Sequence, residues 1–524
     1  MKNLWLKLFG ILFCALIFFA SCQTDDDKFT GIKISYDSPF AEAESSVKIT
    51  GTFYNNDKAD STAELSYEIY ADTTGGAVLS ATTALSGQSV TVTLGSVKGA
   101  FVGIKVFAKN YKSTVGIGTN GNAQISLDDI PIGWALYNEE PEGFFSSLGG
   151  STKVKVNNRE NFIKYVNQGG CVVYVDGMID MTDTGSGTML PDVGSDYNST
   201  PSALDSFVNT KTSGVYTTYS AWKTAYGKAC NSATDDKSGK TAQSELYGTM
   251  SALNSAYGNI IKVRVGSNTT IIGLNKNSGI RGGSLQVYNA SNVVIRNLLL
   301  QDACDPFTHH EANDGFNAQF DCIAIQGSQN IWIDHCTLED TMKLIYVSGE
   351  KWQVYDGLCD ITNTDFYVTI SNCQFKNHDK VMLIGNSSSD VKGSGVTICN
   401  NYFYGCGQRL PLTAFSKIHI YNNYYNGTGG FYSNSVCISG RYTEYTIIAE
   451  NNFFNGVSTA FGSNGSGSNG LCYASGNSTN SGTLGLTSEI PFEVPYAYAL
   501  RTYSEAKDFV EQYSGAGVLT VISD

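Results

Sequence analysis

The chain is short of basic residues: its 524 residues include 34 lysines and arginines against 48 aspartates and glutamates, a formal net charge of −14. Nonspecific binding to nucleic acid requires a basic surface, so this balance argues against that function. Proline is also scarce, with 9 residues, whereas there are 55 glycines and 31 tyrosines. Together with many asparagines, this composition favours strands and turns over bundles of helices. The length allows two or three domains.

Metal-binding or redox patterns of cysteine are absent as well. The sequence contains no C-x-x-C pair and no cysteine–histidine spacing typical of a zinc site. Besides Cys14 and Cys22, eleven cysteines lie between Cys171 and Cys472, and an odd number cannot all pair within one chain. Several fall in apolar runs. Most are therefore expected to be small core residues, although a few disulfides can form outside the cytoplasm.

The first residues have the pattern of a targeting segment. A lysine-flanked apolar run, LFGILFCALIFF, is followed by Ala20-Ser21-Cys22. Small residues before a cysteine resemble a bacterial lipobox, which predicts a signal peptide over residues 1–21 and a lipidated Cys22. A plain signal peptide or a membrane helix is the alternative, although the run is short for a span. The acidic linker over 22–29 resembles the surface-export signal of Bacteroidetes lipoproteins. We therefore expect an outer-membrane lipoprotein, at the cell surface or in the periplasm, that touches the membrane only through its lipid.

Residues 30–127 show period-two alternation of apolar and polar residues. The runs, of which Val47, Ile49 and Phe53 form one, are short and are separated by Gly, Asn and Asp. This pattern predicts a small antiparallel β-sandwich of the Ig-like kind. No catalytic constellation occurs in it. We expect a spacer, with glycan binding as the alternative.

A second unit, over residues 131–524, begins with a helix that Asn158 can cap. Residues 183–258 form a polar insertion with one helical stretch, on which the aromatic residues recur at helical spacing: Tyr219, Trp222 and Tyr226, followed by Ala229. This stripe either packs the insertion onto its neighbour or forms a lid that stacks sugar rings.

A short unit recurs six times in this second part, as VVIRNL, IWIDHC, VTISNC, VTICNN, IHIYNN and TIIAEN. The third position is always isoleucine: Ile295, Ile333, Ile370, Ile398, Ile420 and Ile448. A short strand that recurs with insertions of variable length is typical of a solenoid. Because the strands alternate and no leucine-rich consensus is present, the repeat predicts an all-β, right-handed parallel β-helix.

A polar residue stands two positions beyond each of these isoleucines. The six are Asn297, His335, Asn372, Asn400, Asn422 and Glu450. In register they are expected to stack as a ladder at a turn, where asparagine tolerates left-handed geometry and hydrogen-bonds along the stack. We therefore interpret His335 as structural and not as a catalytic base.

Several longer motifs resemble those of one enzyme family. NIWIDHCTLED, DGLCDIT, VTISNCQFKNHDKVMLIGNSSSD, and QRLP followed by IHIYNNYY are similar to polysaccharide lyase family 1, the pectate and pectin lyases, over about residues 131–515. The resemblance implies a right-handed parallel β-helix that cleaves α-1,4-linked polygalacturonate by β-elimination and releases unsaturated oligogalacturonides. In the pectate lyases it also implies Ca²⁺. We expect a monomer whose partner is the polysaccharide.

By this resemblance, Asp321, Asp356 and Asp360 match the calcium ligands of the family. Calcium is a hard cation that binds oxygen and would neutralise the uronate carboxylate next to the C5 proton. Some family members have a further acidic ligand where this chain has Gln319. Calcium is therefore expected to bind weakly until the substrate adds its own carboxylates.

Arg409 matches the catalytic base of the family, and Lys380 a substrate-binding lysine that would pair with a uronate carboxylate. An arginine side chain is almost always protonated. Arg409 would therefore need cationic surroundings that favour its neutral form, or it stays charged and stabilises the developing negative charge.

One position departs from the family motif Arg-x-Pro-x-x-Arg, because its last residue is Ala414 here. A carboxylate-binding arginine is therefore missing, and the nearby Lys417 is a candidate substitute. Preference for partly methyl-esterified pectin, as in a pectin lyase, is one possible consequence, and loss of activity is another.

Two other motifs carry little weight. Asn363-Thr364-Asp365 spells the NTD of the β-helical polygalacturonases, but their paired aspartate and Gly-His-Gly motif do not follow. His309-His310-Glu311 could suggest a metal site, but adjacent side chains in a strand point to opposite faces, and a loop position is expected. A surface glycan-binding β-helix without catalysis is the non-enzymatic alternative.

The lipobox generates a test of location. A Cys22→Ala variant should no longer partition into the membrane fraction, because the acylated cysteine would be the only anchor. Cell fractionation measures this directly. A variant that still partitions fully into membranes would contradict the assignment.

Overall fold

The computed structural model places most of the second unit. It describes short strands between residues 31 and 125, residues 131 and 133–136, and residues 152–521 except 233–244, 312–314, 348, 364–365, 386–393, 435, 442–443, 465–469, 486, 495 and 497. The predicted signal peptide, the linker and Cys22 lie outside the described residues. None of the helices in the described part is both long and apolar enough to cross a membrane.

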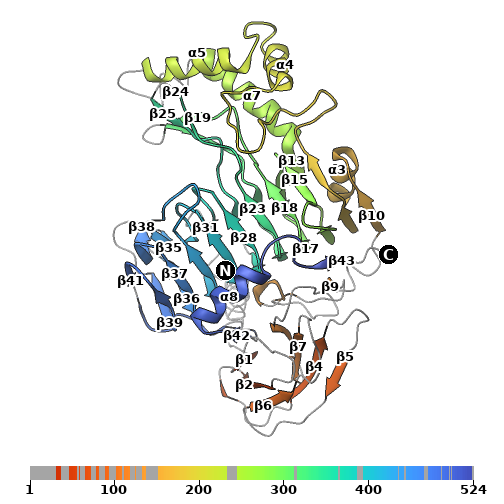
Figure 1. Ribbon diagram of the computed structural model, residues 1–524, viewed down its shortest axis with the longest axis vertical. Helices are drawn as coiled ribbons and strands as arrows, with labels where there is room; N and C mark the ends of the chain where they lie inside the picture. Colours follow the sequence, from red (N-terminus) through yellow and green to blue (C-terminus); the bar gives the residue numbers. More distant parts are fainter. Residues whose placement is uncertain are drawn as a thin grey trace, which may run out of the picture.

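The second unit is a stack of coils whose strands form three parallel sheets (Figure 1). The first sheet contains β10 (Thr152–Val156), β11 (Cys171–Val175), β14 (Thr269–Gly273), β17 (Ser291–Arg296), β22 (Gln329–Asp334), β27 (Tyr367–Ser371), β30 (Gly395–Cys399), β33 (Lys417–Tyr421), β36 (Thr446–Glu450) and β39 (Leu471–Ser475).

The second sheet contains β12 (Met178–Asp180), β15 (Gly279–Arg281), β18 (Leu299–Gln301), β23 (Thr337–Glu339), β28 (Gln374–Lys376), β31 (Tyr402–Tyr404), β34 (Tyr424–Asn426), β37 (Phe453–Asn455) and β40 (Ser478–Thr479). The third contains β13 (Lys262–Arg264), β16 (Ser284–Tyr288), β21 (Ile323–Gln326), β26 (Cys359–Thr362), β29 (Leu383–Ile384), β32 (Leu412–Thr413), β35 (Val436–Arg441), β38 (Thr459–Asn464) and β41 (Thr483–Gly485). This arrangement is a parallel β-helix, so the predicted fold is confirmed.

The repeated isoleucines stack in register inside the solenoid. Ile295, Ile333, Ile370, Ile398 and Ile420 pair in succession and are fully buried. The sixth position was wrong by one residue, because Ile420 pairs with Ala449 and Ile448 pairs with His419. Ile448 packs outside the sheet in a cluster with Trp134 and Tyr421. Apolar residues on both faces of β36 hide the period-two pattern there.

The predicted turn ladder is present, with a correction at its end. Six residues at this turn are left-handed, with φ between 48° and 55°: Asn297, His335, Asn372, Asn400, Asn422 and Asn451. Glu450 is not among them, because it belongs to β36 and pairs with Tyr421. The hydrogen-bonded ladder is formed one residue further on.

Asn401, Asn423, Asn452 and Asn477 form this second ladder. The side-chain oxygens of Asn423, Asn452 and Asn477 each accept the backbone N–H and the side-chain N–H of the asparagine on the preceding coil, at 2.9–3.1 Å. Asn401 Oδ1 accepts the Cys373 N–H at 2.8 Å. Asn401, Asn423 and Asn452 are fully buried. The ladder thus satisfies polar groups that the turns bring into the interior.

The insertion contains more helix than the sequence indicated. Helix α3 (Arg159–Gln168) precedes it, with Asn158 as its cap. The insertion itself includes α4 (Ser202–Lys211), α5 (Tyr219–Ser232) and the start of α7 (Glu245–Ile261). Tyr219, Trp222 and Tyr226 have no exposed surface, so the aromatic stripe packs the insertion and these residues are not a sugar-stacking lid.

A small sheet lies beside these helices (Figure 1). Its strands are β19 (His309–Glu311), β20 (Gly315–Asn317), β25 (Glu350–Trp352) and β24 (Ile345–Val347). The expected loop at His309–Glu311 is therefore a strand. His310 is buried, with Nε2 3.1 Å from Glu350 Oε2, whereas His309 contacts the Tyr247 ring.

The N-terminal region contributes two groups of mostly antiparallel strands. One contains β3 (Lys58–Ala59), β2 (Ser46–Asn55), β1 (Gly31–Tyr36) and β42 (Ala499–Leu500), with β6 (Ser89–Thr93) on β2. The other contains β5 (Val78–Ala81), β4 (Leu65–Ala71), β7 (Val102–Ala108) and β8 (Tyr111–Ile117). The Ig-like sandwich stays a prediction.

Four short elements complete the described structure. Strand β9 (Gln124–Ile125) pairs with β43 (Thr520–Val521), the 3-10 helix η1 (Gly133–Leu136) lies beside the first sheet, and α8 (Tyr503–Tyr513) packs beside β34. All eleven cysteines from Cys171 to Cys472 are buried free thiols. They are core residues, and no disulfide joins them.

The asparagine ladder generates a test of stability. Asn423→Ala should lower the free energy of unfolding by about 3 kcal/mol, because it leaves several buried polar groups without partners. Urea denaturation measures the change, and Asn157→Ala is the control because Asn157 is exposed. A loss for Asn423→Ala as small as that of the control would show that the ladder adds little stability.

Candidate active site

The predicted site residues gather at one end of the third sheet. Gly357 forms a parallel bridge with Lys380, which forms another with Gln408. Adjacent strands are ~4.8 Å apart, so Asp356, Lys380 and Arg409 lie on three successive coils. Backbone hydrogen bonds from Val381 N to Gln408 O (3.1 Å) and from Met382 N to Arg409 O (2.8 Å) fix this register.

Two of the three predicted metal ligands converge beside Gly357. Asp321 precedes β21, and its Oδ1 accepts the Gly357 N–H at 2.9 Å. Asp360 lies in β26, and its Oδ1 accepts the Leu383 N–H at 2.9 Å. A methyl group on Gly357 would lie 2.4 Å from Asp360 Oδ1 and 2.8 Å from Asp321 Oδ1. Only glycine therefore leaves room for both carboxylates.

Burial and mutual repulsion make these carboxylates hard to ionise. Burial, together with the charges of Asp360 and Asp356, raises the pKa of Asp321 well above its usual range. Burial and the charge of Asp356 raise the pKa of Asp360 to about 7. A cation beside the two carboxylates would offset both effects. Their oxygen donors suit a hard cation such as Ca²⁺, so the residues present fit the metal that the family resemblance implies.

The third predicted ligand, Asp356, is engaged elsewhere. Its Oδ1 lies 3.1 Å from Lys380 Nζ, which also donates to Asn317 Oδ1 at 2.6 Å. Lys380 is only 6% exposed. Among the described residues, no group of three His, Cys, Asp or Glu side chains is arranged around a common metal position. The structure thus brings Asp321 and Asp360 together and turns Asp356 toward Lys380.

Arg409 stands half-buried at the next coil, in an unusual backbone conformation. Its φ of 59° is left-handed, which is uncommon for a long side chain and is often found at functional sites. Its positive charge lowers the pKa of Asp360, against the larger effects of burial and Asp356. Arg409 therefore lies within electrostatic reach of the converging carboxylates.

Three other predicted positions are placed as follows. Gln319 is exposed, and its N–H donates to the buried Asp305 Oδ2 at 3.2 Å. Ala414 is fully buried just beyond β32, so an arginine there would have to enter a packed position. Lys417 begins β33, in the first sheet and not in the sheet of β32.

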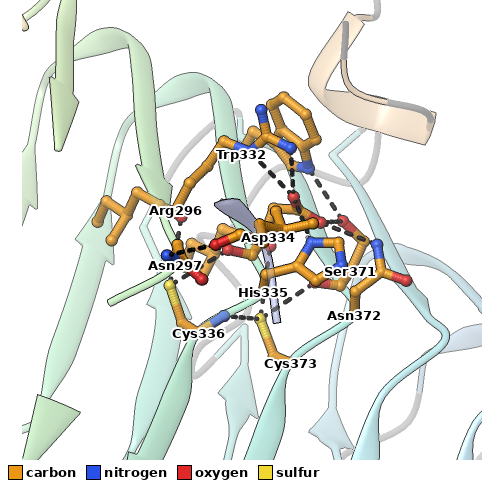
Figure 2. A network of polar contacts seen from close by, with 12 residues as sticks. Arg296, Asn297, Trp332, Asp334, His335, Cys336, Ser371, Asn372 and Cys373 are labelled. Atoms are coloured by element: carbon orange, nitrogen blue, oxygen red, sulfur yellow. Dashed lines mark hydrogen bonds and ion pairs between the residues drawn. The ribbon is translucent and has the colours of Figure 1, made fainter. Parts of the chain in front are cut away.

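His335 lies in a polar network at the first sheet (Figure 2). The predicted metal-binding, substrate-binding and catalytic residues lie at the third sheet. Its Nδ1 is 2.8 Å from Asp334 Oδ2, which is also 2.9 Å from Arg296 Nη2. Ser371 Oγ donates to the other Asp334 oxygen at 2.7 Å. With its left-handed φ of 48°, His335 fits the structural role that the ladder predicted.

Sequence reasoning did not identify His378, which holds the backbone of the site in place through hydrogen bonds. Its Nδ1 is 2.7 Å from Asp340 Oδ2, and its Nε2 lies 2.7 Å from Asp356 O and 3.1 Å from Lys380 O. Because Nε2 faces two carbonyls, it must carry a proton. Burial lowers the pKa of His378, but Asp340 and these hydrogen bonds outweigh burial and raise it. The only sequence signal was its place two residues before Lys380.

Comparison with known proteins identifies the family. The sequence model described as pectate lyase matches residues 225–519, more than half of the chain. The chain belongs to the pectate lyase family.

Individual pectate lyases match parts of the chain. A pectate lyase E of Dickeya chrysanthemi is 34% identical over 278 residues, which are 47% of this chain and 69% of that one. The pectate lyase of Bacillus subtilis (strain 168) is 31% identical over 312 residues, 56% of this chain and 68% of that one. Other matches are shorter: they span 43% of another pectate lyase E and 52% of pectate lyase D, both of D. chrysanthemi.

Solved structures share the fold. A pectate lyase bound to a hexasaccharide superposes with a TM-score of 0.60 at 25% identity, over 77% of this chain and all of that one. A pectate lyase of Acidovorax avenae subsp citrulli gives a TM-score of 0.59 at 21% identity, over 78% of this chain and 99% of that one. The pectate lyase fold thus extends over about three quarters of this chain.

The His378–Asp340 pair generates a prediction. His378→Ala should lower the free energy of unfolding by about 3–5 kcal/mol, because it leaves the Asp340 carboxylate buried without its partner. The double variant His378→Ala/Asp340→Ala should recover part of the loss. Urea denaturation measures both, with the half-buried His309→Ala as control. A His378→Ala loss below about 1 kcal/mol would contradict the assigned pairing.

Proposed function

We propose that this protein is an extracellular pectate lyase that cleaves α-1,4-linked polygalacturonate by calcium-assisted β-elimination and releases unsaturated oligogalacturonides. The observation that carries the proposal is the succession on adjacent coils of two converging carboxylates, then Lys380, then Arg409. We further propose that the protein acts as a monomer, anchored through Cys22 to the outer membrane.

β-Elimination removes the C5 proton of a uronate and breaks the bond from C4 to the glycosidic oxygen. The electron pair of the C5–H bond becomes the C4–C5 double bond, and the departing oxygen takes up a proton. The C5 proton is acidic only if the neighbouring carboxylate is neutralised. Calcium, when bound, would supply that neutralisation, with Asp321 and Asp360 holding it and Asp356 next to them.

Arg409 is placed to act on the C5 proton. It removes the proton as the base, or it remains charged and stabilises the negative charge that develops on the uronate. Lys380 uses two of its three N–H donors in its contacts with Asp356 and Asn317. The third can bind a uronate carboxylate as a point charge. These cations attract a polyanion toward a chain whose net charge is −14.

The direct test follows the ultraviolet absorbance of the unsaturated product. The protein is incubated with polygalacturonate and with methyl-esterified pectin, each in calcium and in excess chelator. We expect calcium-dependent absorbance with polygalacturonate. Activity on esterified pectin alone would identify a pectin lyase, the alternative that the missing family arginine at position 414 raised. New reducing ends without absorbance would indicate hydrolysis, and binding without reaction a non-catalytic glycan-binding protein.

Arg409 carries the sharpest prediction for this reaction. Arg409→Ala should lower the rate on polygalacturonate on the order of 100- to 10,000-fold, because the base or the charge-stabilising group is lost. Initial rates of product absorbance measure this, and urea denaturation should show unchanged stability. The control is Lys155→Ala, which removes an exposed cation from β10. Near-normal rates for Arg409→Ala would show that the site is misplaced.

A further inference from the structure

Two large aromatic side chains lie exposed beside the candidate active site. Tyr346 on β24 is 66% exposed, and Phe431 is 48% exposed. Tyr432, which follows Phe431, is half-buried. We call Tyr346, Phe431 and Tyr432 the aromatic platform. Tyr346 and Tyr432 both adjoin Lys351, and Phe431 neighbours Tyr432 in the chain. A contiguous exposed apolar surface commonly marks a binding site.

The hairpin of β24 and β25 brings Tyr346 to this surface. Tyr346 is the cross-strand partner of Lys351, so the two side chains lie on one face of the hairpin. Lys351 Nζ is 2.8 Å from Asp379 Oδ2 and 5.4 Å from the centroid of the Tyr432 ring. Lys351 thus ties the hairpin to the solenoid and joins Tyr346 to Tyr432.

The chain that carries Phe431 is fastened as well. Phe431 N donates to Asn377 Oδ1 at 3.2 Å, and Tyr432 N donates to Gly405 O at 3.3 Å. A methyl group on Gly430 would lie 2.5 Å from the Cα atom of Gly405, so the two backbones are in close contact. Because the platform is held from several sides, little conformational entropy would be lost when a ligand binds.

The platform is continuous with the proposed catalytic residues. Asp379, the partner of Lys351, directly precedes Lys380 in the chain. Asp379 Oδ1 accepts from Gln408 Nε2 at 3.3 Å, and Asp379 O accepts the Gln408 N–H at 2.7 Å. Gln408 directly precedes Arg409. Asp379, which holds Lys351 of the hairpin, is therefore adjacent to Lys380 in the chain and is linked to Arg409 through Gln408.

We propose that the aromatic platform is a sugar-binding subsite, which holds a galacturonate ring of the polymer next to the ring that is cleaved. The subsite rests on the proposed function, because it takes its ligand from the same polysaccharide. The C–H groups of one pyranose face pack against an aromatic ring, and the ring presents negative density to them. Lys351, over the Tyr432 ring and paired with Asp379, holds the platform without adding net charge. Sugar rings bound on the aromatic platform keep the polymer aligned with Arg409.

The test is a variant that removes both exposed rings. Tyr346→Ala/Phe431→Ala should raise KM for polygalacturonate on the order of 10-fold, since two aromatic contacts are lost. The turnover number should change less than about twofold, because both rings lie outside the reacting atoms. Tyr346→Phe should retain the wild-type KM, because it keeps the ring. Tyr503→Ala is the matched control, since Tyr503 is a 43% exposed aromatic residue on α8.

Binding separates this inference from the proposed function. Calorimetry of Arg409→Ala with polygalacturonate should show affinity that falls about 10-fold when Tyr346→Ala/Phe431→Ala is added. If wild type forms the ultraviolet-absorbing product but the double variant keeps its KM and affinity, the subsite is overturned and the lyase stands. If wild type forms no product but its binding still depends on the two rings, the subsite stands and the lyase is overturned. If wild type neither cleaves nor binds the polymer, both are overturned.

Discussion

The in-register hydrogen bonding of successive coils is the constraint on which the rest of this structure depends. Each coil places its strand ~4.8 Å from the preceding one, so residues far apart in sequence become neighbours at a fixed spacing. The bridges from Gly357 to Lys380 and from Lys380 to Gln408 are two such contacts. They bring residues of three motifs that are separate in the sequence onto one surface. The buried asparagine ladder and the isoleucine stack maintain that register from inside the solenoid.

The two acidic side chains of the candidate site are brought together at a cost in folding stability, which indicates that their arrangement serves a function. Asp321 and Asp360 are held close together in a partly buried position, which raises the pKa of both. Stability alone would favour separating them. The solenoid instead fixes them through backbone N–H donors, and His378 holds the chain at Asp356 and Lys380 from the interior. A cation bound beside the two carboxylates would offset their repulsion.

The sequence was most informative where one periodic signal governs many residues. The repeated isoleucines predicted the parallel β-helix. The resemblance of the motifs to a known family singled out five residues that the structure places at one end of the third sheet: Asp321, Asp356, Asp360, Lys380 and Arg409. The predicted register was wrong by one residue at β36, because apolar residues on both faces of this strand remove the alternation that defines register. His378 was missed because its role depends on two backbone carbonyls that only folding brings to it. The buried position of Ala414 and the pairing of Asp356 with Lys380 are also products of tertiary packing, and no local pattern reports them.

We propose that a polyuronate chain runs across the coils that carry these residues. The most direct measurement is a crystal structure of Arg409→Ala with calcium and an oligogalacturonate. We expect a metal ion bound by Asp321 and Asp360, and sugar rings that follow the coils of β26, β29 and β32, with one ring against Tyr346 and Phe431. Sugar bound on another sheet, or a metal ion held away from Asp321 and Asp360, would contradict it.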